Sequence, residues 1–148
     1  MARELIDWHT HCYLPEHQSE TQKATMQAHG VVGGDGWPEE HRKGVVEHAD
    51  RFVVVAMPNR HAPPAANDFV ADYVAGFGDR ARGLACVDPN DPGALEEFDR
   101  SIRQRGLHGL KLSPVYQGFD PWAKEPWAIY ELAQSLGVPI MFHMGGSF

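Results

Sequence analysis

Two histidines near the start of the chain are spaced like a pair of metal ligands. The run from Asp7 to His11 alternates in the manner of a β-strand, so we expect Asp7, His9 and His11 on one face. Ile6 and Trp8 fall on the opposite face, which we expect to pack under helices. A divalent metal, in the simplest case zinc, would satisfy both imidazoles. Two hydrogen-bonded core histidines are the alternative reading.

A third histidine stands at the end of another apolar run. His143 closes the run that begins at Val138, just before a pair of glycines. In parallel α/β sheets, ligands gather at the carboxyl ends of the strands. We therefore expect His143 to lie level with His9 and His11 across the mouth of a closed barrel.

Lys111 lies within a run expected to be a buried strand, where an unpaired lysine is costly. Three roles are open for it. It could form a structural ion pair with Asp7 or Asp88, bind the carboxylate of a substrate or, once carboxylated, bridge two metals. Structural networks also perturb buried ionisable groups, so burial alone does not choose among these roles.

Alternating apolar runs and helical patterns predict an α/β fold built from consecutive βα units. The expected strands lie near Glu4 to His11, Arg51 to Met57, Arg82 to Val87, Gly106 to Leu112 and Val138 to His143. Helices are expected between them: one over Pro38 to His48, one with Phe69 to Phe77 on its apolar face, one capped by Asp91 and Pro92, and one from Pro126 to Gly137.

The composition of the chain argues against several classes of function. The chain has 148 residues and a net charge of -7 without a Lys/Arg cluster, which argues against nucleic-acid and anionic-membrane partners. No apolar run approaches the roughly 20 residues that span a bilayer. The chain has only two cysteines, Cys12 and Cys86, which we expect to be packing residues, so we predict that the protein is cytoplasmic. Its length predicts a single domain.

Taken in order, four segments resemble the amidohydrolase-related family, the branch of the metal-dependent hydrolases that includes aminocarboxymuconate-semialdehyde decarboxylase. They are Ile6 to His11, Gly83 to Pro89, Gly109 to Pro114 and Val138 to Gly145. The resemblance implies a (β/α)₈ TIM barrel whose divalent metal, usually zinc, is held by His9, His11 and His143. It also implies a strand-six histidine and a strand-eight aspartate, which this sequence lacks.

Length bears on how much of that barrel is present. A full barrel takes about 250 residues, so residues 1–148 are expected to form one partial domain with about the first five βα units. We expect the amino-terminal part of a longer enzyme. A half-barrel that completes itself as a homo-oligomer is the alternative, because its first and fifth strands would otherwise expose edges.

The expected function is that of a metal-dependent hydrolase acting on a small organic acid, ester, lactone or amide through a metal-activated water. Two alternatives stay open: a metal-dependent non-oxidative decarboxylase of an aromatic or unsaturated acid, and a catalytically inactive remnant. In either enzyme Lys111 would bind a substrate carboxylate. No residue is singled out as the catalytic acid or base.

The remaining histidines receive less specific interpretations. His17 and His29 belong to a long loop that could line a substrate pocket. We expect His41, His48 and His61 to be solvated. Three aromatic residues could shape a pocket but are more often core: Trp37, Tyr116 and Trp122.

Overall fold

A computed structural model describes residues 3–18, 20–28, 30, 36–57 and 64–145. Its strands are β1 (Ile6–Thr10), β2 (Arg51–Val55), β3 (Ala81–Cys86), β4 (Leu110–Leu112) and β5 (Ile140–Phe142). Its α-helices are α1 (Glu20–Ala28), α2 (Pro38–His41), α3 (Pro64–Ala75), α4 (Ala94–Arg103), α5 (Pro114–Gln117) and α6 (Trp127–Leu136). Two 3₁₀ turns (Pro15–His17 and Gly78–Arg80) and a π-helical segment (Arg42–Val46) complete the described elements.

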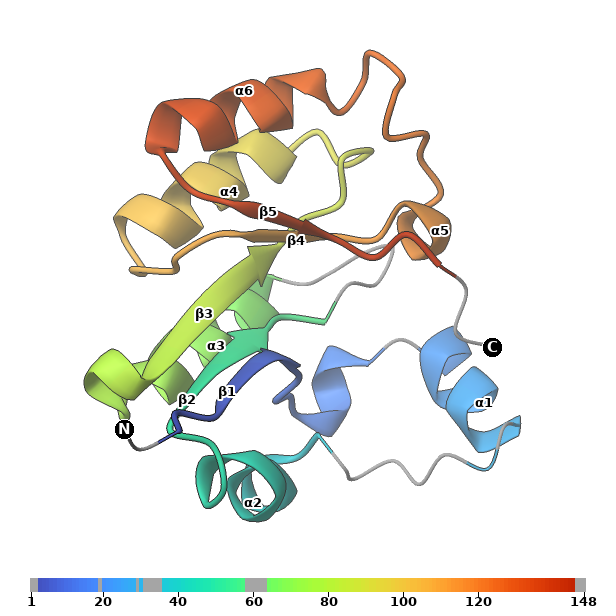
Figure 1. Cartoon of the computed structure of the whole chain (residues 1–148). Coiled ribbons are helices and arrows are strands. Elements are labelled where there is room, and N and C mark those ends of the chain that lie inside the picture. Colours follow the sequence, from blue (N-terminus) through green and yellow to red (C-terminus); the bar gives the residue numbers. More distant parts are fainter. Residues whose placement is uncertain (1–2, 19, 29, 31–35, 58–63, 146–148) are drawn as a thin grey trace.

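The five strands form one parallel sheet in the order β1-β2-β3-β4-β5, so every strand pairs with its neighbour in sequence. Figure 1 shows this sheet curling as it passes from β1 to β5, with α3, α4 and α6 on its outer side. All five expected strands are present, and the arrangement is a partial TIM barrel as expected. The carboxyl ends of the strands share one edge, which is where such folds place their ligands.

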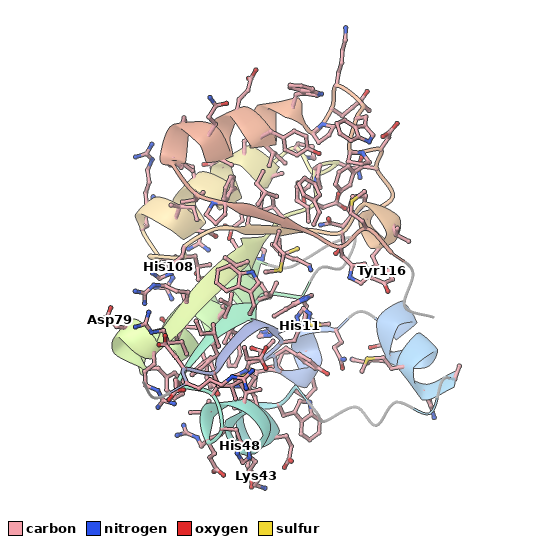
Figure 2. The ribbon with its side chains drawn as sticks, in the orientation of Figure 1. His11, Lys43, His48, Asp79, His108 and Tyr116 are labelled. Atoms are coloured by element: carbon pink, nitrogen blue, oxygen red, sulfur yellow. The ribbon has the colours of Figure 1, made fainter. Side chains whose placement is uncertain are left out.

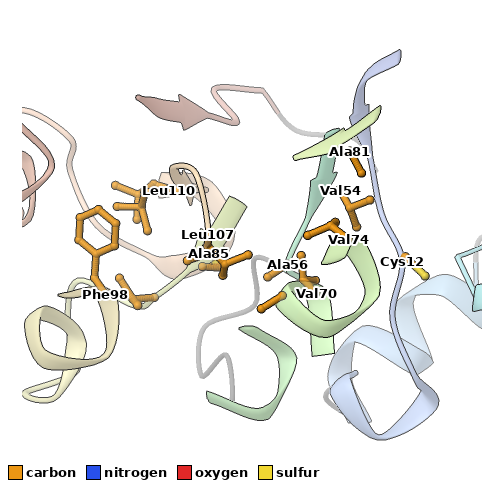
Figure 3. Packing of buried hydrophobic residues seen from close by; sticks show 14 of the residues in the cluster. Cys12, Val54, Ala56, Val70, Val74, Ala81, Ala85, Phe98, Leu107 and Leu110 are labelled. Atoms are coloured by element: carbon orange, nitrogen blue, oxygen red, sulfur yellow. The ribbon is translucent and has the colours of Figure 1, made fainter. Parts of the chain in front are cut away.

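Side-chain alternation divides the sheet into two apolar faces. The outer face packs beneath the helices in the larger cluster, which includes Phe52, Val54, Val70 and Phe98 (Figure 3). The inner face carries a smaller cluster of three buried residues, Val53, Val55 and Leu84, with Met141 packed against it. Gly109 allows the close approach of β4 and β5, because a Cβ there would lie 2.8 Å from the carbonyl oxygen of Pro139.

The residues expected to begin and end a helix do so at α6, whereas the residue expected to cap α4 does not. Pro126 caps the start of α6, and Gly137 ends it with a left-handed φ of 69°, as expected. The predicted cap at Asp91 is wrong, because α4 begins at Ala94 with Gly93 as its N-cap. The Asp91 carboxylate accepts a hydrogen bond from the Gly93 N–H at 2.8 Å, so it closes a turn before the helix.

Two apolar side chains of β1 are not packed as expected. Ile6 is 46% exposed and Trp8 is 68% exposed, and β1 lies at the edge of the described sheet. The neighbouring Leu5 is 56% exposed. The prediction that both residues pack under helices is therefore wrong in this chain.

The segment expected as a helix from Pro38 to His48 is shorter and changes type. It forms α2 as far as His41 and then a π-helical turn that contains Gly44. The interpretation of His41 as solvated is wrong: its side chain is buried and contacts the ring of Phe52. His48 is exposed as expected, and none of the described helices is long and apolar enough to cross a membrane.

Candidate metal centre

A β-bulge in β1 decides which side chains reach the inner face. Asp7 pairs with Phe52 and Thr10 with Val54, so three steps along β1 match two along β2. The Asp7 carboxylate accepts a hydrogen bond from the His9 N–H at 3.3 Å within the bulge. Because Phe52 belongs to the outer cluster, Asp7 lies on the helix side, and the expectation that it shares a face with His9 and His11 is wrong.

The two imidazoles themselves are brought together as expected. The rings of His9 and His11 lie 5.1 Å apart between centroids, at an interplanar angle of 60°. His11 Nδ1 lies 3.1 Å from the carbonyl oxygen of Val55. A carbonyl oxygen can only accept, so Nδ1 carries the proton and Nε2 keeps its lone pair.

Burial keeps both rings in the neutral form that a metal requires. It lowers the pKa of His11 to about 4, with His9 adding to the effect. It also lowers the pKa of His9, with Lys111 and His143 contributing in the same direction and Asp7 opposing them. Both imidazoles are therefore ready to act as neutral ligands.

Lys111 is buried beside this pair. Its Nζ lies 3.2 Å from His9 Nε2, and burial lowers the pKa of its amine. The expected ion pair is not made: Lys111 forms no salt bridge within the described ranges, Asp7 faces the helices, and the Asp88 carboxylate accepts hydrogen bonds from Asn90. Among the residues that the structure describes, the expected pairing of Lys111 with Asp7 or Asp88 is therefore not formed.

His143 follows β5 at the same edge of the sheet. Its N–H donates to the Leu112 carbonyl at 2.9 Å, and its ring lies 5.1 Å from that of Tyr116. Its Nε2 is buried and has no hydrogen-bond partner within the described ranges, although a buried polar atom of this kind is normally paired. Figure 2 shows His11 and Tyr116 at this end of the sheet, with Asp79 and His108 at the other.

The donor set fits a metal in type but is not gathered into a finished site. Two neutral imidazoles lie side by side, and His143 offers an unpaired nitrogen nearby. Among the residues that the structure describes, no three His, Cys, Asp or Glu side chains are grouped closely enough to hold an ion. His9 Nε2 is also engaged by Lys111.

The other candidates lie apart from this site. His17 is buried against Phe69, and its Nδ1 accepts a hydrogen bond from the Leu14 N–H at 3.2 Å. Trp122 is 84% exposed and Trp37 is 41% exposed. His29 and His61 lie outside the described residues. The two cysteines are free and buried, as expected for packing residues.

Gln117 is a structural contributor that the sequence reasoning missed. It is fully buried at the end of α5, where its amide oxygen accepts from the Ser113 N–H and its amide nitrogen donates to the Val87 carbonyl, both at 2.7 Å. This side chain ties the carboxyl ends of β3 and β4 together beside Lys111. The signal in the sequence was its position four residues after Ser113, the residue that precedes the short helix α5.

Comparison with known proteins identifies the family. The sequence profile of the amidohydrolase family matches residues 6–148. A gamma-resorcylate decarboxylase from Polaromonas sp. (strain JS666 / ATCC BAA-500) is 27% identical over 164 residues, which cover 88% of this chain and 48% of that protein. The chain thus spans about half the length of this relative.

Solved structures show the same fold. A proposed amidohydrolase from Staphylococcus aureus superposes with a TM-score of 0.73 at 22% identity, covering 95% of this chain and 47% of that one. A 5-carboxyvanillate decarboxylase from Novosphingobium aromaticivorans, solved with bound manganese and a nitrobenzoic acid, gives a TM-score of 0.67 at 18% identity, covering 95% and 50%. With the profile match over nearly its whole length, this chain belongs to the amidohydrolase family.

Proposed function

We propose that this chain supplies the metal-binding part of a metal-dependent enzyme acting on a small organic acid. The observation that carries the proposal is the pair of neutral imidazoles, His9 and His11, beside the buried amine of Lys111 at the carboxyl edge of a parallel sheet. His143 is the third ligand of the proposed site, because its Nε2 is buried without a partner in the described structure.

The metal would be divalent, with zinc as the first candidate because imidazole nitrogens suit it. When bound, it would polarise a carbonyl or carboxylate oxygen and activate a water molecule. His11 contributes an Nε2 lone pair that is fixed by its bond to the Val55 carbonyl. His9 contributes its ring once Lys111 turns its ammonium group toward a substrate.

Lys111 is the proposed binding group for a substrate carboxylate. A buried ammonium without a carboxylate partner in the described structure attracts an anion strongly, since little water competes for it. Its contact with His9 places that anion next to the imidazole pair. This arrangement favours an acid as the substrate over a neutral amide.

Non-oxidative decarboxylation of an aromatic or unsaturated acid is the reaction we place first. It breaks the bond between the ring or alkene carbon and the carboxyl carbon, and a proton replaces the carbon dioxide that leaves. The carboxylate-binding role of Lys111 supports it, and so do the names of two similar proteins. Hydrolysis of an ester, lactone or amide is the second candidate, because the same imidazole pair would serve a metal-activated water.

The location and partners of the protein are further proposals. Free, buried thiols at Cys12 and Cys86 are consistent with the cytoplasm. A small molecule is the proposed partner, and we expect neither nucleic acid nor a membrane surface because the net charge is -7.

Metal content tests the proposal directly. Purified chain should hold about one zinc or manganese ion by elemental analysis, and His9→Ala combined with His11→Ala should abolish it. His48→Ala combined with His108→Ala is the matched control, because both of these histidines are exposed and lie away from the pair. Equal metal in the two double variants would refute the site. Two metals per chain in bicarbonate would point instead to a carboxylated Lys111.

Activity distinguishes the two reactions. Release of carbon dioxide from hydroxybenzoic acids, against hydrolysis of aryl esters and lactones, should be measured with metal added. We expect carbon dioxide release to depend on Lys111, so Lys111→Met should abolish it while metal content stays unchanged. Activity retained in Lys111→Met would exclude its role as the carboxylate-binding group.

A further inference from the structure

Behind β1, on the helix side, three polar side chains form a continuous series of hydrogen bonds. The Thr10 hydroxyl lies 2.8 Å from the Val53 carbonyl and 2.9 Å from His41 Nε2. His41 Nδ1 lies 3.0 Å from the hydroxyl of Tyr73. Thr10 and His41 are 6% and 2% exposed, so little water competes for these bonds.

The directions of these bonds are fixed by the groups at the Thr10 end. The Val53 carbonyl can only accept, so the single Thr10 proton is donated to it, and Thr10 Oγ1 must accept from His41 Nε2–H. A neutral His41 then presents a lone pair at Nδ1, which accepts from the Tyr73 hydroxyl. The hydroxyl of Thr10, both ring nitrogens of His41 and the hydroxyl of Tyr73 therefore all have a partner.

The series holds one of the two chain neighbours of His11. Thr10, which precedes His11, is bonded to His41 on the helix side, and Cys12, which follows His11, is buried in the outer apolar cluster. Alternation then directs His11 to the inner face, where its Nδ1 meets the Val55 carbonyl. The regular strand ends at Thr10 and the bulge lies just before it, so ladder hydrogen bonds alone do not hold His11 in place.

We propose that Thr10, His41 and Tyr73 form a clamp that positions His11, holding its ring so that Nε2 faces the candidate metal centre. These are positioning residues, because none of them reaches the inner face where His9 and Lys111 meet. The expected effect on metal affinity rests on the proposed function, whereas the orientation of His11 can be tested without metal.

The threonine offers a matched pair of variants. Thr10→Val keeps the shape of the side chain but removes its hydroxyl, whereas Thr10→Ser keeps the hydroxyl. Nitrogen-15 NMR of the imidazoles in the metal-free chain should show His11 protonated at Nδ1 in wild type and in Thr10→Ser. In Thr10→Val a second tautomer should appear. Zinc affinity should fall about 10- to 100-fold in Thr10→Val, the usual effect of losing a group that orients a ligand, and Thr10→Ser should restore it.

Two more variants separate positioning from general destabilisation. Ser101→Ala removes a fully buried hydroxyl from α4, away from the clamp, and should leave both the His11 tautomer and zinc affinity unchanged. Tyr73→Phe removes the bond at the far end of the clamp and should reproduce the tautomer change if Thr10→Val fails to fold.

The outcomes distinguish the clamp from the proposed function. The clamp is overturned if Thr10→Val and Tyr73→Phe both keep the wild-type tautomer of His11, or if Thr10→Ser behaves like Thr10→Val. A wild-type chain that binds no zinc, but in which Thr10→Val changes the tautomer, would support the clamp and refute the metal site.

Discussion

A histidine must be neutral to bind a metal. Burial lowers the pKa of His11, so its imidazole stays neutral at pH values where an exposed histidine would be protonated. Its pKa in the folded chain is about 4, against 6.5 for the free side chain. The unfolded chain therefore takes up this proton first as the pH falls below about 6.5. Stability from this group is fully present above that pH and is lost as the pH falls towards about 4.

This difference predicts acid sensitivity at the scale of one residue. Between about pH 7 and about pH 4, the metal-free chain should lose up to about 3 kcal/mol through His11, at about 1.4 kcal/mol per pKa unit. Urea unfolding across this range, compared between wild type and His11→Gln, measures it. The variant should lose less stability on acidification, because glutamine does not titrate. Parallel losses in both proteins would contradict the pKa assigned to His11.

Single residues also show how far sequence alone could lead. His9 and His11 were recognisable from their alternating spacing and His143 from its place at the end of an apolar run, and the structure brings the first two together. His41 was not recognisable, since the surrounding Pro-Glu-Glu-His segment reads as a solvated helix end. Its burial depends on Phe52 and Tyr73, which approach it only when the chain folds.

At the scale of elements, period-two and helical patterns predicted all five strands and the helices α3, α4 and α6, but not α1, which lies in a segment expected to be a loop. The β-bulge could not be predicted, because it depends on how β1 and β2 align rather than on either strand alone. That one extra residue moves Asp7 to the helix side and removes it as a partner for Lys111. Strict alternation therefore placed the histidines correctly and the aspartate incorrectly.

The carboxyl end of β3 is held by an amide side chain from α3. Asn67 is 1% exposed; its oxygen accepts from the Cys86 N–H at 2.8 Å, and its nitrogen donates to the Cys86 carbonyl at 3.0 Å. It also donates to Glu97 on α4. The residue therefore joins β3, α3 and α4 next to the strand position that pairs with Lys111.

Removing this amide should cost more than removing a surface charge. Asn67→Ala leaves the Cys86 backbone groups unpaired and should lower the free energy of unfolding by about 2 to 4 kcal/mol. Asp72→Ala, on the same helix, removes an exposed ion pair with Arg105 and should cost at most about 1 kcal/mol. Denaturant unfolding of both variants checks the difference. Similar losses would show that Asn67 contributes no more than a surface contact.

At the scale of the molecule, the described sheet has two strands that pair on one side only. These are β1 and β5, and apolar side chains stand exposed at both. Trp8 on β1 is 68% exposed, and Met144 just beyond β5 is 62% exposed. Edge strands with apolar side chains are sites where chains associate, because unpaired backbone groups and apolar surface are both available.

We therefore expect the 148-residue chain to self-associate in solution. Sedimentation velocity at increasing protein concentration should show species larger than the monomer, and Trp8→Lys should shift the distribution towards the monomer by placing a charge on the β1 edge. Trp122→Lys is the matched control, because Trp122 is 84% exposed but belongs to neither edge strand. A wild-type chain that stays monomeric at every concentration, or two variants that shift the distribution equally, would show that these edges do not drive association.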